Sequence, residues 1–489
     1  MPALVAGIHA EPHDDAGSDS PALSTVLHSR RNGSAWTAGT SPAMTDWSIS
    51  RRTLLGGVAA TVVALPSRAQ QAGDGFRILE ARKTGLKISP EGETQGFGYD
   101  GAVPGPILRA KQGDEIRVRL VNRLDQPTSL HWQGLTGDNA NDGVAGLTQK
   151  AVPSGQSFDY RFRANAAGTL FYKPAIQPHN VEQIARGLCG VLIVDEPEPP
   201  EVDRDLLIVL QDWRLDGKGA LSAPFGEPGG GRVGPLLSVN GAAAPLSETA
   251  PPGGRIRIRL VNACVSRIAV AIFDGGAPHC IAIDGQAVDP FQLVRNTAPI
   301  GPGARFEFIY DLAAGGAPDL ALGLWAGQDK PRLPVFALKA KGEKVPARPA
   351  FTTLPPNPRL PPEIRLGEAR KLDFALEPPK AAGGAWTFNG APQSYAGKPL
   401  FTVKRGTPVS AGFANRSDVA VSMHVHGHCM RLLHDLDDGW EPYWRNSVIV
   451  AKGATKRVAF VADTPGKWAL RSDVADQEAA GLAGWFEVT

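Results

Sequence analysis

Three segments of this 489-residue chain repeat one pattern, in which apolar and polar residues alternate after a glycine and end on an asparagine. They are Gly113–Asn122, Gly254–Asn262 and Gly406–Asn415. A period of two residues is typical of a β-strand with one buried face. The spacing of roughly 140 to 150 residues is too long for a solenoid repeat and suits a β-sandwich domain. The chain is therefore predicted to fold into three similar sandwiches.

A second strand pattern follows each copy, and we expect it to lie beside the first. These second patterns are Ser129–Gln133, Arg267–Phe273 and Val419–His426. The 56 glycines and 42 prolines favour the same fold class, because both residues interrupt helices and serve turns. We predict an all-β protein of three Greek-key β-sandwich domains.

Proline-rich segments and apolar runs indicate the domain boundaries. An apolar run at Gly187–Val194 closes the first domain, and Glu196–Pro200 is a stiff linker. We predict domain one at 73–196, domain two at 203–341, a proline-rich linker at 342–364 and domain three at 365–489.

The N-terminal region has the order of an export signal. Arg51 and Arg52 precede an uncharged run, Gly56–Pro66, and Ser67-Arg68-Ala69 is a plausible cleavage site. We predict a twin-arginine signal at 44–69, cleavage after Ala69 and a periplasmic mature protein. Residues 1–43 are predicted to be a mis-assigned start, with translation from Met44, or a disordered segment. The alternative to an export signal is an apolar helix that packs on the fold and follows two arginines by chance.

Charge and cysteine content exclude some classes of protein. The formal net charge of +2 gives no indication of nucleic acid or an anionic membrane as a partner. After the signal, no apolar run is long enough to predict a transmembrane segment in the mature chain. We expect a monomer that binds a periplasmic protein or small ligand.

The four cysteines lack CxxC spacing. Cys264 and Cys280 could pair, or all four could be buried thiols, and these alternatives stay open. The four are Cys189, Cys264, Cys280 and Cys429.

A motif near the C-terminus narrows the interpretation. Asp463-Thr464-Pro465-Gly466-Lys467-Trp468 and the residues up to Leu482 resemble the last copper motif of the multicopper oxidase family. That motif reads Asp-x-Pro-Gly-x-Trp-x-x-His-Cys-His-x-x-x-His-x-x-x-Gly-Met. Further similar landmarks are Tyr99–Pro106, Asp142–Val144 and Ala282–Gln286. The resemblance covers the chain from about residue 76 and implies three cupredoxin-like domains.

The family uses four motifs to bind a type 1 copper, which accepts electrons, and a trinuclear cluster, which reduces oxygen. Imidazole and thiolate ligands suit copper at such sites. By this resemblance His131 and His424 correspond to the type 2 ligands and His426 to one type 3 ligand. The other ligand positions are occupied by other residue types. At type 1 positions these are Val421, Ser472, Gln477 and Leu482, and at type 3 positions Gln133, Lys173, Ala175, Arg471 and Asp473.

These replacements predict that oxygen reduction by the multicopper mechanism is absent. For the remaining histidines two hypotheses compete. His131, His424 and also His426 could hold one copper or zinc ion, with water or Asp473 completing the shell. Alternatively, no metal is bound, and the histidines join a polar network in which Asp473 faces Arg471 and Lys173. The second hypothesis is favoured, so we expect no cofactor, with one copper ion as the alternative.

We therefore predict a non-catalytic periplasmic binding or structural protein, similar to the family's copper-free relatives; one of these supports bacterial cell division under stress, a role that serves only as an analogy. The alternatives are a copper-binding oxidoreductase with a mononuclear site and a metal-buffering protein without turnover. His179 and His279 fit no ligand pattern, and Cys429 aligns with no ligand position. His428 and His434 lie near His426 in the sequence. The sequence contains no other catalytic motif that we recognise.

Overall fold

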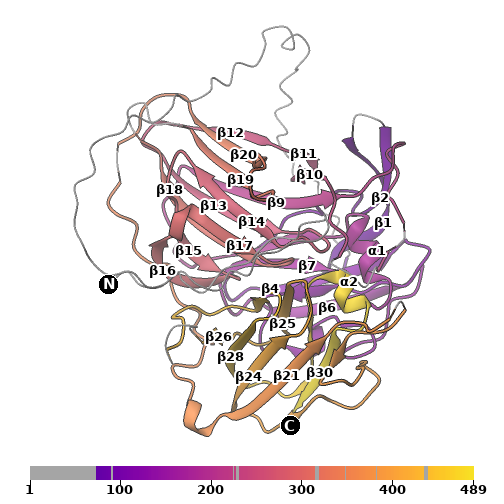
Figure 1. Cartoon of the computed structure of the whole chain (residues 1–489). Coiled ribbons are helices and arrows are strands. Elements are labelled where there is room, and N and C mark those ends of the chain that lie inside the picture. The colour runs from indigo at the N-terminus through magenta and orange to yellow at the C-terminus, as the bar shows by residue number, and fades with distance from the viewer. Residues whose placement is uncertain are drawn as a thin grey trace. The chain divides into compact units, whose positions relative to one another are not determined.

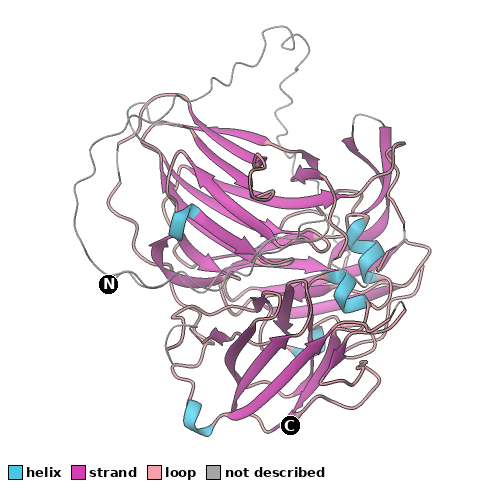
Figure 2. Cartoon of the chain, in the orientation of Figure 1, coloured by secondary structure: helices cyan, strands magenta, loops and turns pink. Residues whose placement is uncertain are grey.

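Strands make up most of the described structure, a computed structural model that covers residues 73–89, 92–223, 225–226, 231–313, 319–346, 348–381, 383–433 and 439–489. The predicted export signal, residues 1–43 and His434 lie outside these described residues. Six sheets face one another in pairs and form three sandwiches (Figures 1 and 2). The predicted all-β fold class is confirmed.

The first sandwich packs a sheet of order β2-β1-β4-β6 against a sheet of order β3-β8-β7-β5. Its core joins Leu79 and Leu120 of one sheet to Leu170 and Leu192 of the other. The elements are β1 (Arg77–Ser89), β2 (Gly92–Tyr99), β3 (Leu108–Lys111), β4 (Glu115–Asn122), β5 (His131–Gln133), η1 (Asn139–Asn141), β6 (Ser157–Arg163), β7 (Gly168–Lys173), α1 (Asn180–Ala185) and β8 (Gly190–Asp195).

The second sandwich packs a sheet of order β11-β10-β9-β13-β18-β15-β16 against a sheet of order β12-β20-β19-β14-β17. Ile258, Phe308, Leu322 and Phe336 lie in its core. The elements are β9 (Arg204–Trp213), β10 (Leu236–Val239), β11 (Ala242–Ala243), β12 (Leu246–Ala250), β13 (Arg255–Asn262), β14 (Ala269–Asp274), β15 (His279–Ile283), β16 (Gln286–Gln292), η2 (Val294–Asn296), β17 (Thr297–Ile300), β18 (Arg305–Asp311), β19 (Leu320–Leu324) and β20 (Leu333–Ala340).

The third sandwich packs a sheet of order β22-β21-β24-β28-β26 against a sheet of order β23-β30-β29-β25-β27. Val409, Phe460, Leu470 and Phe486 lie in its core. The elements are η3 (Leu366–Glu368), β21 (Arg370–Glu377), β22 (Thr387–Phe388), β23 (Thr402–Val403), β24 (Thr407–Asn415), β25 (Val421–Val425), β26 (Arg431–Leu432), β27 (Ser447–Val450), β28 (Thr455–Ala462), β29 (Gly466–Ser472), α2 (Ala475–Ala479) and β30 (Ala483–Val488).

All three sandwiches share the same parallel strand pairings. In one sheet of each, the first strand pairs in parallel with the strand that ends on the repeated asparagine: β1 with β4, β9 with β13, and β21 with β24. In the opposite sheet, β3 pairs in parallel with β8, β12 with β20, and β23 with β30. Parallel neighbours need long crossing connections, as Greek-key folds provide. The recurrence in the sequence therefore reflects a recurrence of topology.

The repeated asparagine is buried and makes the same hydrogen bonds in each sandwich. Its Oδ1 accepts from the backbone N–H two residues later, at 3.0 Å in all three copies. Its Nδ2 donates to at least two backbone carbonyls, such as those of Gln126 and Val152 for Asn122. A buried amide is stable only with such partners. The three residues are Asn122, Asn262 and Asn415.

The expectation that the next strand lies beside each repeated strand is wrong. β5, β14 and β25 each lie in the opposite sheet from β4, β13 and β24. The reason is the asparagine, which bonds to the chain that turns away after it and so ends the strand. Alternation of apolar and polar residues gives a strand its faces but does not show which sheet the following strand joins.

Strand β13 departs from the half-buried pattern. All eight of its residues are buried, including the arginines on the polar face. Arg257 pairs with Glu196 of the first sandwich at 2.6 Å and with Glu307 of β18 at 2.5 Å. Arg259 donates to Thr169 of β7 at 2.9 Å. The polar face of this strand is therefore an ion-paired contact between the first two sandwiches, not a solvated surface.

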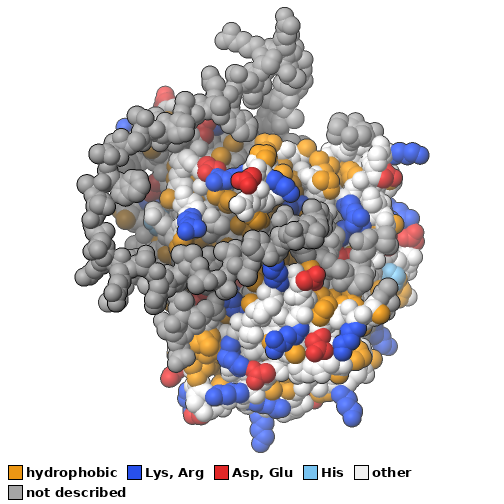
Figure 3. All heavy atoms as spheres, in the orientation of Figure 1, with side chains coloured by type: hydrophobic (Ala, Val, Ile, Leu, Met, Phe, Trp, Pro, Cys, Tyr) orange, Lys and Arg blue, Asp and Glu red, His pale blue; other side chains and the backbone are white. Residues whose placement is uncertain are grey.

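Four further observations concern the predicted linker, the cysteines, membrane-spanning helices and the surface charge. Within the described part of 341–365 no strand or helix is formed. The four cysteines are free and buried. No helix of the described residues is long and apolar enough to cross a membrane. On the face shown in Figure 3, basic and acidic side chains are interspersed.

Candidate functional site

The histidines and cations of the predicted site are brought together by strand pairing in two sandwiches. In the first sandwich His131 of β5 lies directly opposite Lys173 of β7. In the third, His424 of β25 lies directly opposite Arg471 of β29. Directly opposed residues point to the same face of a sheet, so each sandwich presents a histidine beside a cation.

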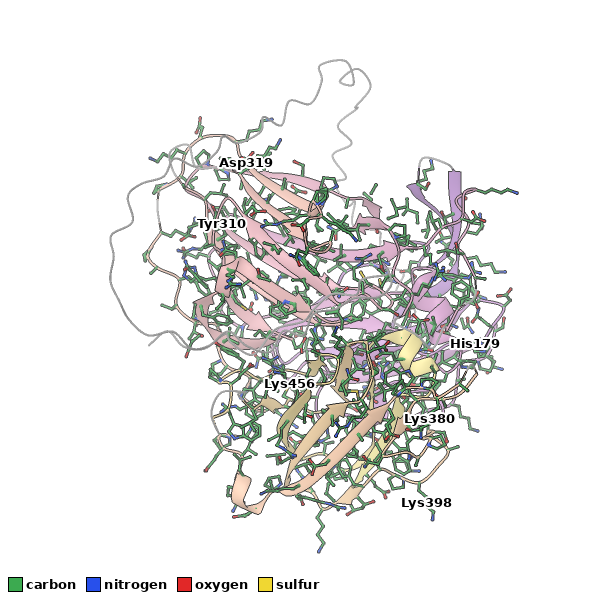
Figure 4. All side chains as sticks on the ribbon, in the orientation of Figure 1. His179, Tyr310, Asp319, Lys380, Lys398 and Lys456 are labelled. Atoms are coloured by element: carbon green, nitrogen blue, oxygen red, sulfur yellow. The ribbon has the colours of Figure 1, made fainter. Side chains whose placement is uncertain are left out.

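His131, His424 and His426 form one buried group. Their ring nitrogens include a set of three that lie within 4.8 Å of one another. The ring centroids of His131 and His426 are 4.2 Å apart and stacked, and those of His424 and His426 are 4.6 Å apart. Other histidines lie elsewhere: His279 is exposed, and His179 is half-buried at the start of α1 (Figure 4). The structure thus places the three predicted residues together.

Two of these histidines present a free ring nitrogen to the centre. Nδ1 of His131 lies 2.6 Å from the carbonyl oxygen of Asp142, and Nδ1 of His424 lies 2.8 Å from that of Asn446. A carbonyl can only accept, so each Nδ1 carries a hydrogen, and in a neutral ring Nε2 then keeps its lone pair. Neither Nε2 has a hydrogen-bond partner among the described residues. This is the arrangement of a metal-binding histidine held from behind.

A tight turn brings the Asp142 carbonyl to His131. Gly143, which follows Asp142, has φ of +82°, a conformation that residues with a Cβ rarely adopt. A Cβ at this position would lie 1.9 Å from the carbonyl oxygen of Leu130. Glycine is therefore required for the loop to approach β5 so closely.

The third histidine is already engaged on both ring nitrogens. Nδ1 of His426 lies 3.0 Å from a carboxylate oxygen of Asp142, and Nε2 accepts a hydrogen bond of 2.6 Å from Nε of Arg471. The guanidinium is always charged and can only donate, so it uses the lone pair that a metal would need. His426 therefore differs from His131 and His424 in what it can bind.

A buried ion-pair network surrounds the histidines. Asp473 accepts from Nζ of Lys173 at 3.1 Å and from Nε2 of Gln133 at 2.8 Å. Arg471 pairs with Glu478, and its Nη2 lies 3.7 Å from Asp473. These five residues are at most 3% exposed. The network links the first sandwich to the third through Asp473, which faces both Lys173 and Arg471.

The network shifts the pKa values of the groups within it. Burial alone would raise the pKa of Asp473, but the nearby cations, led by Lys173, hold it well below its usual range. Burial lowers the pKa of His424 to about 4, against a smaller opposing effect of Asp473. At neutral pH the centre therefore contains a charged Asp473 and a neutral His424.

The residues at the predicted type 1 positions lie together inside the third sandwich. Ser472 donates to the side-chain oxygen of Gln477 at 2.8 Å, and Gln477 donates to the carbonyl of Ala420 at 2.9 Å. Val421 and Leu482 belong to the apolar core of the same domain. All four are fully buried. Ala175, at a predicted type 3 position, packs against Val144 and Ala469.

Four residues of the network were not found by the sequence reasoning. Asp142 bonds to two histidines, Glu478 to Arg471, Asn180 to Glu478 at 2.7 Å, and Asn446 to His424. Asp142 stood in a recognised landmark, and Glu478 stood in the same motif as Arg471. Asn180 and Asn446 gave no signal in the sequence.

The fold and the site together define a protein of three cupredoxin-like sandwiches with a histidine centre between the first and third. Multicopper oxidase family models match residues 82–199 and 365–489. The chain is 30% identical to the multicopper oxidase MmcO of Mycobacterium tuberculosis, over 79% of this chain and 81% of the relative. It is 25% identical to laccase-1 of Botryotinia fuckeliana, over 79% and 77%. The chain belongs to the multicopper oxidase family.

Solved structures are similar over most of the chain. A multicopper oxidase from Pseudomonas thermotolerans superposes with a TM-score of 0.75 at 30% identity, covering 84% of this chain and 98% of that one. A multicopper oxidase from Pseudomonas parafulva gives a TM-score of 0.75 at 27% identity, covering 84% and 100%. The three-sandwich arrangement is thus shared with structures of this family.

Proposed function

We propose that this chain is an exported, periplasmic member of the family that does not reduce oxygen and acts as a binding or structural protein. The proposal rests on the residues at the predicted ligand positions. A serine hydroxyl, a carboxamide and two aliphatic side chains do not supply the thiolate and imidazoles of a type 1 copper site. A lysine and an arginine at the cluster positions would repel copper ions.

The observation that most supports this proposal is the hydrogen bond from Arg471 to Nε2 of His426. It places the permanently charged guanidinium against the lone pair of the one histidine at a predicted type 3 position, and Glu478 and Asp473 balance that charge. A buried charge is stable only with such compensation. In this proposal, paired side-chain charges occupy the place that the copper cluster has in catalytic relatives.

Metal content and colour test this function directly. The full chain is matured in copper-supplemented cells and purified, and copper per chain, the visible spectrum and oxygen uptake with a phenol are measured. We expect at most one copper, no blue absorption and no oxygen uptake above that of the buffer. Four coppers with a blue colour, or sustained oxygen uptake, would overturn the proposal. A copper-loaded family member with intact ligands serves as the positive control.

A second candidate function is a mononuclear copper site, favoured by the two unpartnered Nε2 atoms of His131 and His424. Both rings are oriented by backbone carbonyls, so little reorganisation is needed for both nitrogens to bind one ion. Bound copper would supply one-electron redox chemistry at this position. The chain itself would hold the ion through these two histidines, while Asp473 and Arg471 set the charge around it.

A variant pair separates this candidate from chance binding. His424→Ala should lose the single copper of protein matured in copper-supplemented cells. His279→Ala removes an exposed histidine and should retain it. If wild-type protein contains no copper, the second candidate fails and the first stands. If His424→Ala keeps its copper, the ion binds elsewhere.

A further inference from the structure

The landmark Ala282–Gln286 of the second sandwich has no role in the predicted copper motifs, yet it contacts Asn446, which bonds to His424 of the buried centre. Asp284 and Gly285 have φ of +51° and +76° and form the two-residue turn between β15 and β16. Such a turn needs positive φ at both positions, which Asp-Gly supplies. Its tip approaches the first sandwich so closely that a Cβ on Gly168 would lie 2.4 Å from the carbonyl oxygen of Gly285.

The same turn binds the third sandwich. The carboxylate of Asp284 accepts from the backbone N–H of Asn446 at 2.9 Å and from that of Ser447 at 3.2 Å. Arg305 of β18 donates to the side-chain oxygen of Asn446 at 2.9 Å. Arg305 also donates to the carbonyl of Thr169 in the first sandwich at 3.1 Å. Two side chains of the second sandwich therefore hold Asn446 of the third, and one of them, Arg305, also contacts the first.

Asn446 in turn fixes His424. Its carbonyl oxygen lies 2.8 Å from Nδ1 of His424, and its side-chain nitrogen donates to the carbonyl of His428 at 3.2 Å. Asn446, Asp284 and Arg305 are each at most 2% exposed, so water does not compete for these bonds. A histidine whose other nitrogen faces a candidate metal site depends on such a partner for its tautomer and ring orientation.

We infer that Asp284 and Arg305 are positioning residues, through which the second sandwich sets the tautomer and orientation of His424 by holding Asn446. The second sandwich contributes no histidine to the centre among the described residues, but it determines which nitrogen His424 presents there. The role is independent of whether His424 binds copper, because it concerns the ring before any ion arrives. A purely structural contact between domains would leave the tautomer of His424 unchanged.

The test reads the tautomer directly. Full-length protein labelled with ¹⁵N-histidine is stripped of metal with a chelator, and the ring nitrogens of His424 are observed by NMR at one neutral pH. The signals are assigned by their loss in His424→Gln. Wild-type protein should show a single state with hydrogen on Nδ1. In Arg305→Met and in Asp284→Ala, that single state should be replaced by a mixture of tautomers.

Arg259→Met is the matched control. Arg259 is also a buried arginine of the second sandwich, and it donates to the side-chain hydroxyl of Thr169 instead of the carbonyl. No bond to Asn446 is described for it. Its loss should leave the His424 signals in place. Should Arg305→Met fail to fold, Arg305→Lys keeps the charge with fewer hydrogen bonds and should give an intermediate mixture. Unchanged His424 signals in the folded Arg305 and Asp284 variants, or an equal change in Arg259→Met, would overturn the inference.

Discussion

Arg471, Ser472 and Asp473 are consecutive residues, but their side chains enter two different neighbouring regions. One region is neutral and lies inside the third sandwich, and the other is charged and lies between domains. Ser472 points into the third sandwich, where it meets Gln477 among apolar residues. Arg471 and Asp473, on either side of it, meet charged partners that reach from the first sandwich or from α2. Successive residues of a strand face opposite sides. Within one domain the predicted ligand positions are filled by neutral packing, whereas between two domains they are filled by paired charges.

This contrast teaches what each region can tolerate. Removing one partner of a neutral hydrogen bond in a core leaves the other partner buried and unsatisfied, at a cost of about 1–3 kcal/mol. A buried ion pair that loses one partner leaves an uncompensated charge away from water. The interdomain centre should therefore be far more sensitive to single substitutions than the neutral region beside it.

The largest effect is expected for Asp473→Asn. The substitution keeps the size of the side chain but leaves Lys173 and Arg471 short of one negative charge. One-sided loss of a buried ion pair costs about 3–5 kcal/mol. The midpoint of urea unfolding should fall accordingly. The contrast between the two regions would be broken if this variant were as stable as wild type.

Acid should produce the next effect in chelator-treated protein. His424 has a pKa of about 4 in the folded chain, below its ordinary unfolded value of about 6.5. Between these values the unfolded state binds a proton that the folded state does not, so stability falls as pH drops. This one residue should contribute a loss of about 3 kcal/mol between pH 6.5 and 4. Urea midpoints measured across this range check it, and His424→Gln should flatten the slope.

Replacing both Lys173 and Asp473 tests whether the two side chains act as a pair. Lys173→Met removes the cation that Asp473→Asn leaves unpaired, so the double variant should be more stable than the sum of the two single losses predicts. For contacting charges we expect a coupling of about 2 kcal/mol, within the usual range for neighbours. A double-mutant cycle of unfolding midpoints measures this coupling. Strictly additive losses would show that the two side chains do not act as a pair.

The smallest effect is expected for Ser472→Ala. The change removes the hydrogen bond that Ser472 donates to Gln477 and the one that it accepts from the backbone N–H of Val474. Both groups left behind are neutral, so the loss should be about 1–2 kcal/mol. Thermal unfolding compares it with Asp473→Asn, its neighbour in the chain. A loss as large as that of Asp473→Asn would mean that the neutral region, too, depends on one polar contact.

Much of the architecture could be predicted because it depends on local and repeated signals. Asn122, Asn262 and Asn415 each end a strand through bonds to nearby residues, so the pattern is visible within a dozen positions of sequence. The direction of the next strand was not predictable, since both sheets of a sandwich accept the same alternation. The burial of the polar face of β13 was not predictable for a related reason. Arg257 pairs with Glu196 of another domain, and the alternation of apolar and polar residues does not distinguish a face exposed to water from one that contacts another domain.

The candidate site was predictable only where the family resemblance named a position. His131, His424 and His426 were found in this way, and the structure brings them together. Asp142 bonds to His426 across 284 positions of sequence, and Asn446 holds His424 through its backbone oxygen. A backbone acceptor has no residue type that a motif could reveal. Such supporting contacts therefore emerge only from the folded chain.

The direct meeting of Gly168 and Gly285 also bears on how the protein could be loaded. At that seam the backbones of the first two sandwiches are in contact with no side chain between them. The two domains therefore cannot slide past one another without a steric clash. Buried ion pairs lock the same seam. Asp284 of the same turn also holds Asn446 of the third sandwich, so the three domains cannot part around the buried His131 and His424 without breaking these contacts. An ion at these histidines should therefore enter while the chain folds, and copper added to the folded protein should reach them only slowly. Whether the centre contains an ion would then depend on whether copper is present while the chain folds.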